Sequence, residues 1–337
     1  MSMSHKSKVR VAIVGCGYWG PNLIRNFLEN DQCVVVTVCD KNSKKLAIFK
    51  KRHPLIRVTI DFSEVLKDPS IDAVALATPI PLHFSFVRQA LLAGKHVYVE
   101  KPMAHTLRHA ETLLKLSHKV KKVLMVGHTF LFSPPVIKIK ELLDKKELGK
   151  LYFINMTRVN LGIHQSKNNV LWDLAPHDLS ILIYWLEEQP IRVTAFGRDC
   201  LKKGLVDVAY LCLQFPSGII ANLNLSWLAP GKIRSSVLVG SKKMVLYDDT
   251  HTERQIQIFN SCATLKDPKD FGEYQLTYRT GDVLVPHLSN VEPLSECLRH
   301  FIECIQKNKT PKTNAEHALN VIKIIDAAQK KLKVLDS

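Results

Sequence analysis

Apolar and polar residues along the first 127 positions follow two different rhythms. Short continuous apolar runs, typical of strands buried on both faces, alternate with segments that show the periodicity of amphipathic helices. The predicted strands cover residues 9–15, 34–40, 71–78, 96–100 and 123–127. The predicted helices cover residues 21–29, 43–51, 85–93 and 107–120. This order indicates an α/β fold with a doubly wound parallel sheet covered by helices on both faces.

The pattern changes after residue 128, where a helix over 136–143 is followed by long strands of alternating character. In ANLNLSW, the apolar residues Ala221, Leu223, Leu225 and Trp227 fall on one face of the strand and the polar residues on the other. One-sided alternation predicts a mainly antiparallel sheet with one face packed on helices. The segment FPSG at 215–218 predicts a hairpin turn, and two amphipathic helices near 293–307 and 315–335 end the chain.

We therefore expect two domains, residues 1–127 and 128–337, with C-terminal helices that can pack back on the first. A length of 337 residues agrees with two hydrophobic cores. The chain is 46% hydrophobic and 23% charged, as in ordinary globular proteins. No apolar run reaches the roughly 18 residues of a membrane span, and the short polar N-terminus leads into a strand, so neither a membrane nor a signal peptide is expected.

The eight cysteines form no CxxC pair, and several lie in apolar runs typical of strands. Reduced cysteines behave there as small hydrophobic residues, which favours a cytoplasmic protein without disulfides. No metal site is expected. The net charge of +16 comes from lysines spread along the chain without interleaved aromatic residues. That distribution indicates a solvated surface and no nucleic-acid partner, although a positive field would favour an anionic substrate.

The segment GCGYWG follows the first predicted strand and opens the first predicted helix. It matches GxGxxG, in which Gly15 permits a tight turn, Gly17 admits a pyrophosphate, and Gly20 permits close packing of the helix on the strand. The loop also contributes Tyr18 and Trp19 to the expected cofactor site.

Asp40 ends the second predicted strand, 20 residues after Gly20. A carboxylate at this point accepts hydrogen bonds from the ribose hydroxyls and repels a 2′-phosphate, so NAD is favoured over NADP. Lys41 weakens that preference. The alternative interpretation of the motif is a structural glycine-rich turn without a ligand.

Two further loops follow the carboxyl ends of predicted parallel strands, ATPIPLH at 77–83 and VEKPM at 99–103. Ligands of doubly wound sheets bind at this edge. We expect Thr78 and Pro79 to pass beneath the adenosine and ribose. His83 is a candidate contact, with a partly solvated helix residue as the alternative.

The succession of GxGxxG, TPxxxH and Glu-Lys-Pro resembles the glucose–fructose oxidoreductase/inositol dehydrogenase family over nearly the whole chain. The resemblance implies a Rossmann domain followed by an α/β domain with an open-faced antiparallel sheet. It further implies that Lys101 reaches the substrate hydroxyl and the nicotinamide, that Glu100 lines the nicotinamide pocket, and that the bond to Pro102 is cis.

Family members also carry a D-x-x-x-H pair, which WDLAPH reproduces with Asp173 and His177. Residues four apart share one face of a helix, although Pro176 favours a helix that starts only near Ala175. The resemblance implies reversible alcohol oxidation, with His177 as the general base, Lys101 stabilising the developing alkoxide, and Asp173 orienting His177 or holding a substrate hydroxyl. Asp178 is either a structural cap or a substrate contact.

The segments around 157–179 and 226–249 are similar to UDP-N-acetylglucosamine 3-dehydrogenases, which oxidise the sugar 3-hydroxyl. This similarity implies a nucleotide-sugar substrate whose expected contacts are Arg158, Asn160, His164, Lys232 and Arg234. The alternatives are an inositol or free-sugar dehydrogenase, a dTDP-ketosugar reductase, and a non-catalytic NAD- or sugar-sensing regulator. Family members assemble through the sheet, so a homodimer or homotetramer is expected.

Overall fold

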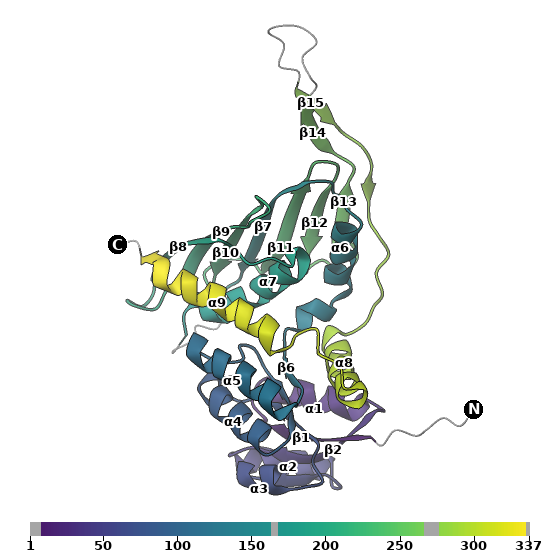
Figure 1. Cartoon of the computed structure of the whole chain (residues 1–337), viewed down its shortest axis with the longest axis vertical. Coiled ribbons are helices and arrows are strands. Elements are labelled where there is room, and N and C mark those ends of the chain that lie inside the picture. The colour runs from purple at the N-terminus through teal and green to yellow at the C-terminus, as the bar shows by residue number, and fades with distance from the viewer. Residues whose placement is uncertain (1–7, 163–167, 266–275, 335–337) are drawn as a thin grey trace, which may run out of the picture. The chain divides into compact units, whose positions relative to one another are not determined.

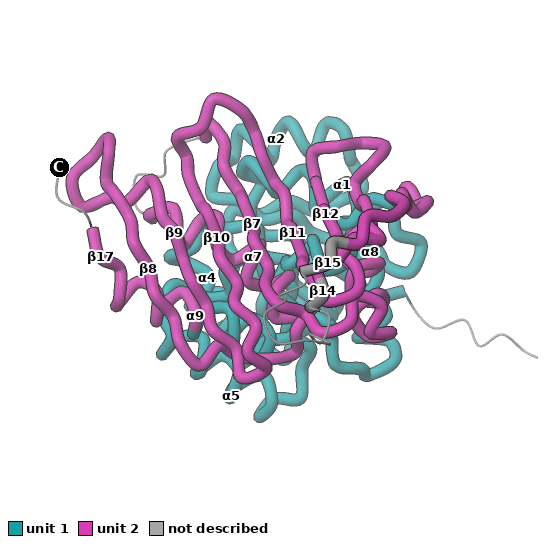
Figure 2. Tube along the Cα trace, turned by 90° about the horizontal axis from the view of Figure 1, so that it is seen from above, with its two compact units in different colours: residues 1–132, 291–323 teal, residues 133–290, 324–337 magenta. Residues whose placement is uncertain are grey.

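The structure, a computed structural model, describes residues 8–162, 168–265 and 276–334. Contacts within the chain divide it into two compact units, which Figure 2 colours separately. Unit 1 combines Met1–Phe132 with Val291–Lys323, and unit 2 combines Ser133–Asn290 with Ile324–Ser337. The predicted domain of residues 128–337 is therefore divided, because the chain returns to unit 1 near its C-terminus.

Unit 1 contains a parallel sheet with helices on both of its faces (Figure 1). Its strands are β1 (Val9–Val14), β2 (Cys33–Cys39), β3 (Arg57–Thr59), β4 (Ala73–Leu76), β5 (His96–Val99) and β6 (Leu124–Val126). Its helices are α1 (Gly20–Glu29), α2 (Ser43–Arg52), α3 (Phe62–Lys67), α4 (Ile80–Leu92), α5 (Leu107–Val120), the 3-10 helix η1 (Thr129–Phe132), α8 (Pro293–Lys307) and the first part of α9 (Ala315–Lys331). The continuous apolar runs form the central strands, and all four residues of β4 are fully buried.

The strand order of this sheet is β3-β2-β1-β4-β5-β6, with every neighbouring pair parallel. The order reverses between β1 and β4, and ligands of such sheets bind beside this switch point at the carboxyl ends of the strands. The loops after β1, β2, β4 and β5 therefore border the expected cofactor site.

The C-terminal part of unit 1 completes its core. On α8, Phe301 is fully buried, with its ring 5.8 Å from that of Tyr98 in an edge-on arrangement. Glu292 bonds to Arg25 and Asn26 of α1. Thr313 then hydrogen-bonds Val126 of the edge strand β6 through both its backbone and its hydroxyl.

Unit 2 contains a sheet of nine strands in the order β16-β13-β12-β11-β7-β10-β9-β8-β17. Neighbouring strands are antiparallel except for the parallel pairs β7–β10 and β8–β17. The strands of unit 2 are β7 (Leu151–Val159), β8 (Arg192–Arg198), β9 (Val208–Gln214), β10 (Ile220–Ser226), β11 (Ile233–Gly240), β12 (Met244–Asp248), β13 (Ile256–Phe259), β14 (Cys262–Leu265), β15 (Leu276–Arg279), β16 (Val283–Leu284) and β17 (Leu332–Val334). Its helices are α6 (Pro134–Asp144), α7 (Val170–Leu186) and the last part of α9.

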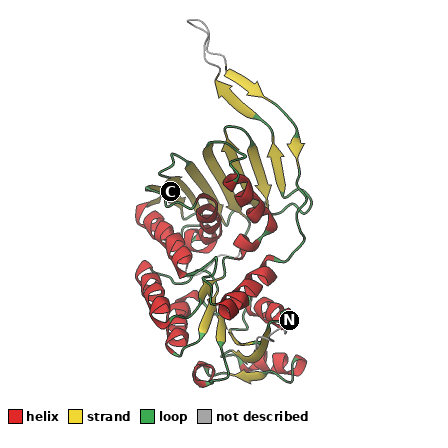
Figure 3. Cartoon of the chain, turned by 45° about the vertical axis from the view of Figure 1, so that its right-hand side comes forward, coloured by secondary structure: helices red, strands yellow, loops and turns green. Residues whose placement is uncertain are grey.

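The two faces of this sheet differ, as the alternating sequence predicts. Ala221, Leu223, Leu225 and Trp227 are each at most 1% exposed, and β10 packs against α7. Figures 1 and 3 show helices α6 and α7 on one face of the sheet. The opposite face carries exposed aromatic side chains and a shallow cavity lined by ten residues of β7 to β10, among them Asn155, Phe196, Tyr210 and Asn222. The mainly antiparallel, open-faced sheet is thus confirmed, with two parallel pairs.

Several details differ from the sequence-based expectations or extend them. The predicted turn at 215–218 joins β9 to β10, with Gly218 at a φ of 86°. Among the described strands, β14 and β15, which were not predicted, pair only with each other, and they project beyond the nine-stranded sheet (Figure 3). All eight cysteines are free thiols. Within the described residues, every helix is too short or too polar to cross a membrane.

Candidate active site

The glycine-rich loop of unit 1 leaves space where a cofactor phosphate would bind. Gly15 has a φ of +101°, and a Cβ there would lie 2.5 Å from the Ala77 carbonyl oxygen, so only glycine fits. A Cβ at Gly20 would lie 2.1 Å from the Gly15 carbonyl oxygen. A Cβ at Gly17, by contrast, would meet no atom of the described chain within 4 Å. The loop therefore packs tightly on the sheet side and is open above Gly17, which fits a bound pyrophosphate.

Asp40 lies at the end of β2, beside this loop. Its carboxylate accepts hydrogen bonds from the backbone amides of Cys16 and Asn42. The contacts hold the carboxylate next to the glycine-rich loop, where a ribose would be bound. The Tyr18 side chain is 92% exposed, so it points into solvent and does not cover the glycine-rich loop.

Thr78 and Pro79 follow β4 on the other side of the switch point. The Thr78 hydroxyl is buried and has no hydrogen-bond partner within the described part of the chain. Buried hydroxyls are almost always paired, so this one is available to a ligand or water. Together with the open space above Gly17, it fits NAD in this position.

His83 on α4 does not face this space. It is 1% exposed, its Nδ1 lies 2.8 Å from the Pro102 carbonyl oxygen, and its Nε2 lies 2.7 Å from the Thr78 carbonyl oxygen. Burial lowers the pKa of His83, while the hydrogen bonds to both carbonyls oppose this effect. The expected direct contact with the cofactor is therefore corrected, because the ring joins the loop after β4 to the loop after β5.

Glu100 ends β5 as the centre of a small polar cluster. Its Oε1 accepts hydrogen bonds from the Trp19 indole at 2.8 Å and from the Tyr98 hydroxyl at 3.2 Å. Burial raises the pKa of Glu100 to about 7, with the neighbouring Lys101 acting in the opposite direction. Sequence reasoning missed Gly127, where a Cβ would lie 3.0 Å from the Glu100 carboxylate. Gly127 directly follows β6 at the same edge of the sheet, and this position could have identified it as a residue of the site.

Lys101 follows Glu100, and the bond to Pro102 is cis, as the resemblance implied. Lys101 is partly exposed, whereas the next three residues are buried. His128 is another residue that sequence reasoning missed. It is 2% exposed, and its pKa is lowered by burial, then by His317 and Lys101. Lys101 therefore lies at the carboxyl edge of the sheet, next to the buried residues 102–104 and close enough to the buried His128 to affect its pKa.

Asp173 and His177 lie together on α7 in unit 2. The helix begins at Val170 rather than near Ala175, because Asn169 caps it by accepting a hydrogen bond from the Trp172 amide. Pro176 is accommodated inside the helix. Both site residues are partly exposed on a helix that is otherwise mostly buried, and the spacing of four places them on one face. The Trp227 indole, a contact that was not predicted, donates a hydrogen bond of 3.0 Å to Asp173 Oδ2.

Arg158 lies on β7, and its side chain, unlike those of Asp173 and His177, is buried. It is 6% exposed and donates from Nε and Nη2 to both carboxylate oxygens of Asp178, at 2.6–3.0 Å. Asp178 is 3% exposed. The expected role of Arg158 in holding substrate is corrected, because its guanidinium is committed to a buried ion pair. Asp178 lies inside α7 and so does not cap it, and its carboxylate is bound by Arg158.

The other predicted substrate residues occupy different surroundings. Asn160 follows β7 and is partly exposed, and Lys232 is exposed just before β11. Arg234 on β11 is partly exposed and lies 3.3 Å from Asp249. His164 lies outside the described residues. Lys232 and Asn160 thus remain accessible, whereas Arg234 already has an anionic partner.

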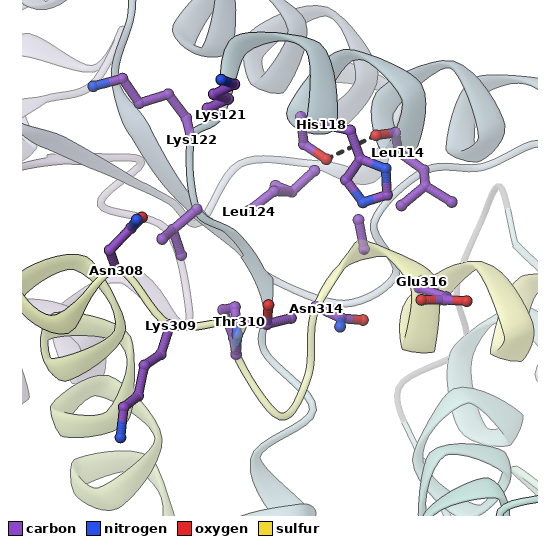
Figure 4. A pocket seen from close by; sticks show the side chains of 14 residues that line it. Leu114, His118, Lys121, Lys122, Leu124, Asn308, Lys309, Thr310, Asn314 and Glu316 are labelled. Carbon is purple, nitrogen blue, oxygen red and sulfur yellow. Dashed lines mark hydrogen bonds between the residues drawn. The ribbon is translucent and has the colours of Figure 1, made fainter.

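Among the cavities of unit 1, one borders the predicted cofactor loop and another lies away from every predicted residue. One, of about 740 Å³, lies between α1 and α2 and opens beside Gly17 and Tyr18. The other, of about 410 Å³, is lined by the end of α5, the residues before β6 and the start of α9 (Figure 4). It lies at the amino ends of the strands, opposite the ligand-binding edge. Figure 4 shows the side chains of Lys122 and Lys309 pointing away from each other, so its lysines do not converge on one ligand.

Comparisons with known proteins agree with this geometry. Residues 9–128 match the model of an oxidoreductase family with an NAD-binding Rossmann fold, and residues 136–246 match the GFO/IDH/MocA C-terminal domain. The chain is 26% identical over 327 residues to the scyllo-inositol 2-dehydrogenase (NAD(+)) of Bacillus subtilis, covering 92% of this chain and 89% of that protein. It is 28% identical over 234 residues to a 1-carboxy-3-chloro-3,4-dihydroxycyclohexa-1,5-diene dehydrogenase of Comamonas testosteroni, covering 66% of this chain and 58% of that protein.

Among solved structures, a UDP-N-acetylglucosamine 3-dehydrogenase from Acidithiobacillus ferrooxidans superposes with a TM-score of 0.80 at 19% identity. The superposition covers 97% of this chain and 98% of that one. At this identity the likeness shows the shared fold. The two family models together span most of the chain, and they assign NAD as the cofactor of unit 1. The chain belongs to the GFO/IDH/MocA family of NAD-binding oxidoreductases.

Proposed function

We propose that this oxidoreductase uses NAD to oxidise a hydroxyl of a nucleotide-linked sugar, the 3-hydroxyl of UDP-N-acetylglucosamine in the first instance. The observation that carries the proposal is the pair Asp173 and His177, which occupy the partly exposed stripe of the otherwise mostly buried helix α7. A carboxylate and an imidazole held on one face provide an acid–base pair that a merely structural helix does not need.

The proposed roles follow from the chemistry of the side chains. His177 takes the proton of the substrate hydroxyl, while Lys101 stabilises the negative charge that develops on the same oxygen. Asp173, which is held by Trp227, orients His177 or binds a neighbouring substrate hydroxyl. Bound NAD would supply the hydride acceptor for the carbinol carbon, and the products would be a ketone, NADH and protonated His177.

In unit 1, the described contacts support binding of the cofactor. The open space above Gly17 and the start of α1 suit the pyrophosphate, and the Asp40 carboxylate suits the ribose hydroxyls. Thr78 and Pro79 lie at the switch point beside them. Glu100 would border the nicotinamide, held in place by Trp19 and Tyr98.

A phosphate-bearing substrate is favoured by charge. The chain carries a net charge of +16, and Lys232 is exposed beside Arg234 at the start of β11. A UDP-N-acetylglucosamine 3-dehydrogenase has the same fold over 97% of the chain, so the fold can accommodate this substrate class. A dTDP-ketosugar reductase would use the same residues in the reverse direction.

An inositol or free-sugar dehydrogenase is the second candidate, and one observation favours it. Both arginines expected to contact the substrate, Arg158 and Arg234, are paired with carboxylates, Asp178 and Asp249. A substrate without phosphate would need neither. A purely NAD- or sugar-sensing protein is disfavoured, because Lys101, Asp173 and His177 are all present.

The open face of the nine-stranded sheet supports a homodimer or homotetramer. Phe153, Phe196, Tyr210 and Ile220 are each at least 36% exposed there. Clustered exposed apolar side chains mark interaction surfaces. The eight free thiols agree with a reducing cytoplasm.

The test uses the purified protein with NAD and a panel of UDP-sugars, dTDP-sugars, free sugars and inositols, with absorbance of NADH and mass spectrometry of the products as readouts. Turnover of UDP-N-acetylglucosamine that is lost in Lys101→Ala and His177→Ala is the expected result. Turnover confined to free polyols would replace the substrate and keep the catalytic roles. Tight NAD binding without turnover of any compound would overturn the proposal in favour of a sensor.

A further inference from the structure

Arg158 and Asp178 form a buried ion pair inside unit 2. The guanidinium donates three hydrogen bonds to the carboxylate, from Nε to both oxygens and from Nη2 to Oδ1. Both residues are less than a tenth exposed. Desolvating two charges costs free energy that apolar residues of similar size would not incur, so stability alone is a weak reason for this pair. The hydrogen bonds between the guanidinium and the carboxylate have a preferred direction, which an apolar contact lacks.

The pair joins the helix that carries the proposed base to the centre of the sheet. Arg158 belongs to β7, and Asp178 follows His177 directly on α7. Successive residues of a helix point about 100° apart, so Asp178 faces the sheet while His177 occupies the partly exposed stripe. One turn earlier, Trp227 at the end of β10 holds Asp173. His177 is thus bracketed by two hydrogen-bonded tethers to different strands.

A second ion pair lies beside Arg158 on the neighbouring strand. Arg234 of β11 lies directly opposite Arg158 in the antiparallel ladder. Asp249 accepts a hydrogen bond of 3.3 Å from Arg234 and one of 3.1 Å from the Tyr247 hydroxyl. Two arginines side by side are thereby compensated by two carboxylates, one on α7 and one after β12. Arg158 therefore belongs to a charged array that joins β7, β11 and α7.

We propose that Arg158 and Asp178 are positioning residues for His177, which fix the rotation of α7 about its axis. The proposal rests on the proposed function only for the role of His177. Apolar packing along α7 is non-directional, whereas a guanidinium–carboxylate fork sets an angle. A side-chain tip lies roughly 5–6 Å from a helix axis, so a rotation of about 10° moves it by about 1 Å. A displacement of that size can lower a turnover rate by roughly 100-fold.

Three variants separate positioning from simple stability. Arg158→Lys keeps the charge but loses the fork. Asp178→Asn loses the charge and leaves Arg158 buried without a counter-ion. The double variant Arg158→Met with Asp178→Leu leaves no unpaired buried charge, and apolar replacements of this kind can be neutral for folding. The matched control is Lys140→Met, since Lys140 of α6 is 9% exposed and pairs with Asp144 and with Glu187 at the far end of α7.

Each variant is measured for kcat, KM, NAD affinity and thermal unfolding, and its His177 ring signals are followed by nuclear magnetic resonance, with His177→Asn providing the assignment. We expect kcat to fall about 10- to 100-fold in Arg158→Lys and in the double variant, with NAD affinity unchanged. The His177 signals should shift in both, whereas Lys140→Met should lose thermal stability but keep kcat and the His177 signals.

Wild-type kcat and unshifted His177 signals in a folded double variant would overturn the proposal, whatever the single variants do. Loss of kcat in Lys140→Met with shifted His177 signals would also overturn it, because any disturbance of α7 would then suffice. If the wild-type protein oxidises no compound of the panel, the proposed function fails separately. The His177 signals of the double variant and of Lys140→Met then still decide whether the pair positions this side chain.

Discussion

Replacing Glu100 with glutamine isolates the effect of burying an ionisable group at the edge of the cofactor site. Burial raises the pKa of Glu100 from an ordinary 4.5 to about 7. The folded protein therefore retains this proton at pH values where the unfolded chain has lost it. Stability must fall as the pH rises from 4.5 to about 7, by about 3 kcal/mol in total. Glutamine cannot ionise, and its amide oxygen can still accept the hydrogen bonds from Trp19 and Tyr98.

The assay is urea unfolding of the wild type and of Glu100→Gln across this pH range, with hydrogen exchange of the β5 amides reporting on unit 1. Buried histidines such as His96, whose pKa burial lowers to about 4, give the opposite slope, but they are common to both proteins and cancel in the difference. We expect the variant to gain about 3 kcal/mol over the wild type between pH 4.5 and pH 7. Glu111→Gln, an exposed carboxylate on α5, controls for the loss of one acid. A difference that stays constant with pH, or that changes equally in the control, would refute the reasoning.

Two further predictions concern the cofactor and the helix of the proposed base. Asp40→Asn removes the carboxylate beside the glycine-rich loop. NAD binding, measured by calorimetry, should weaken roughly 10- to 100-fold, and the ratio of NAD affinity to NADP affinity should fall. An unchanged ratio would contradict the proposed ribose contact. Asn169→Ala removes the cap of α7 and should lower the free energy of unfolding by about 1 kcal/mol in urea titrations. Asn169→Ser, which can still cap the helix, should restore most of that loss. Equal losses in both variants would assign the effect to the hydrogen bond from the Asn169 amide to Gln329 instead.

The parallel sheet of unit 1 could be predicted closely because its strands are buried on both faces. Continuous runs such as Ala73–Leu76, bounded by helical segments, leave few alternative structures. The helix Leu107–Val120 has the predicted bounds. The strand Arg57–Thr59 and the helix Phe62–Lys67 were missed, because three and six residues are too short to establish a periodicity.

The start of α7 shows how tertiary packing overrides a local preference. Proline favours the first turn of a helix, which suggested a start near Ala175. The structure places Pro176 inside the helix instead, which starts at Val170, five residues before the expected start, with Asn169 as its cap. Most residues of α7 are buried, and that burial outweighs one lost backbone hydrogen bond. The earlier start strengthens the assignment of Asp173 and His177, because both now lie within one continuous helix.

Arg158 marks the limit of reasoning from sequence about substrate. The sequence pattern around an arginine on an alternating strand is the same whether its guanidinium binds a ligand phosphate or a buried carboxylate. The role of the arginine depends on which of these partners the fold places beside it. Here the partner is Asp178, one residue beyond the proposed base on α7. In our proposal Arg158 and Asp178 thus serve the placement of α7 rather than the recognition of an anion. In our proposal, catalytic competence depends on α7 and Lys101, whereas the charge of the substrate is matched by accessible groups such as Lys232. A change of substrate class would leave the argument for the positioning pair intact, since the pair acts on His177 and not on the sugar.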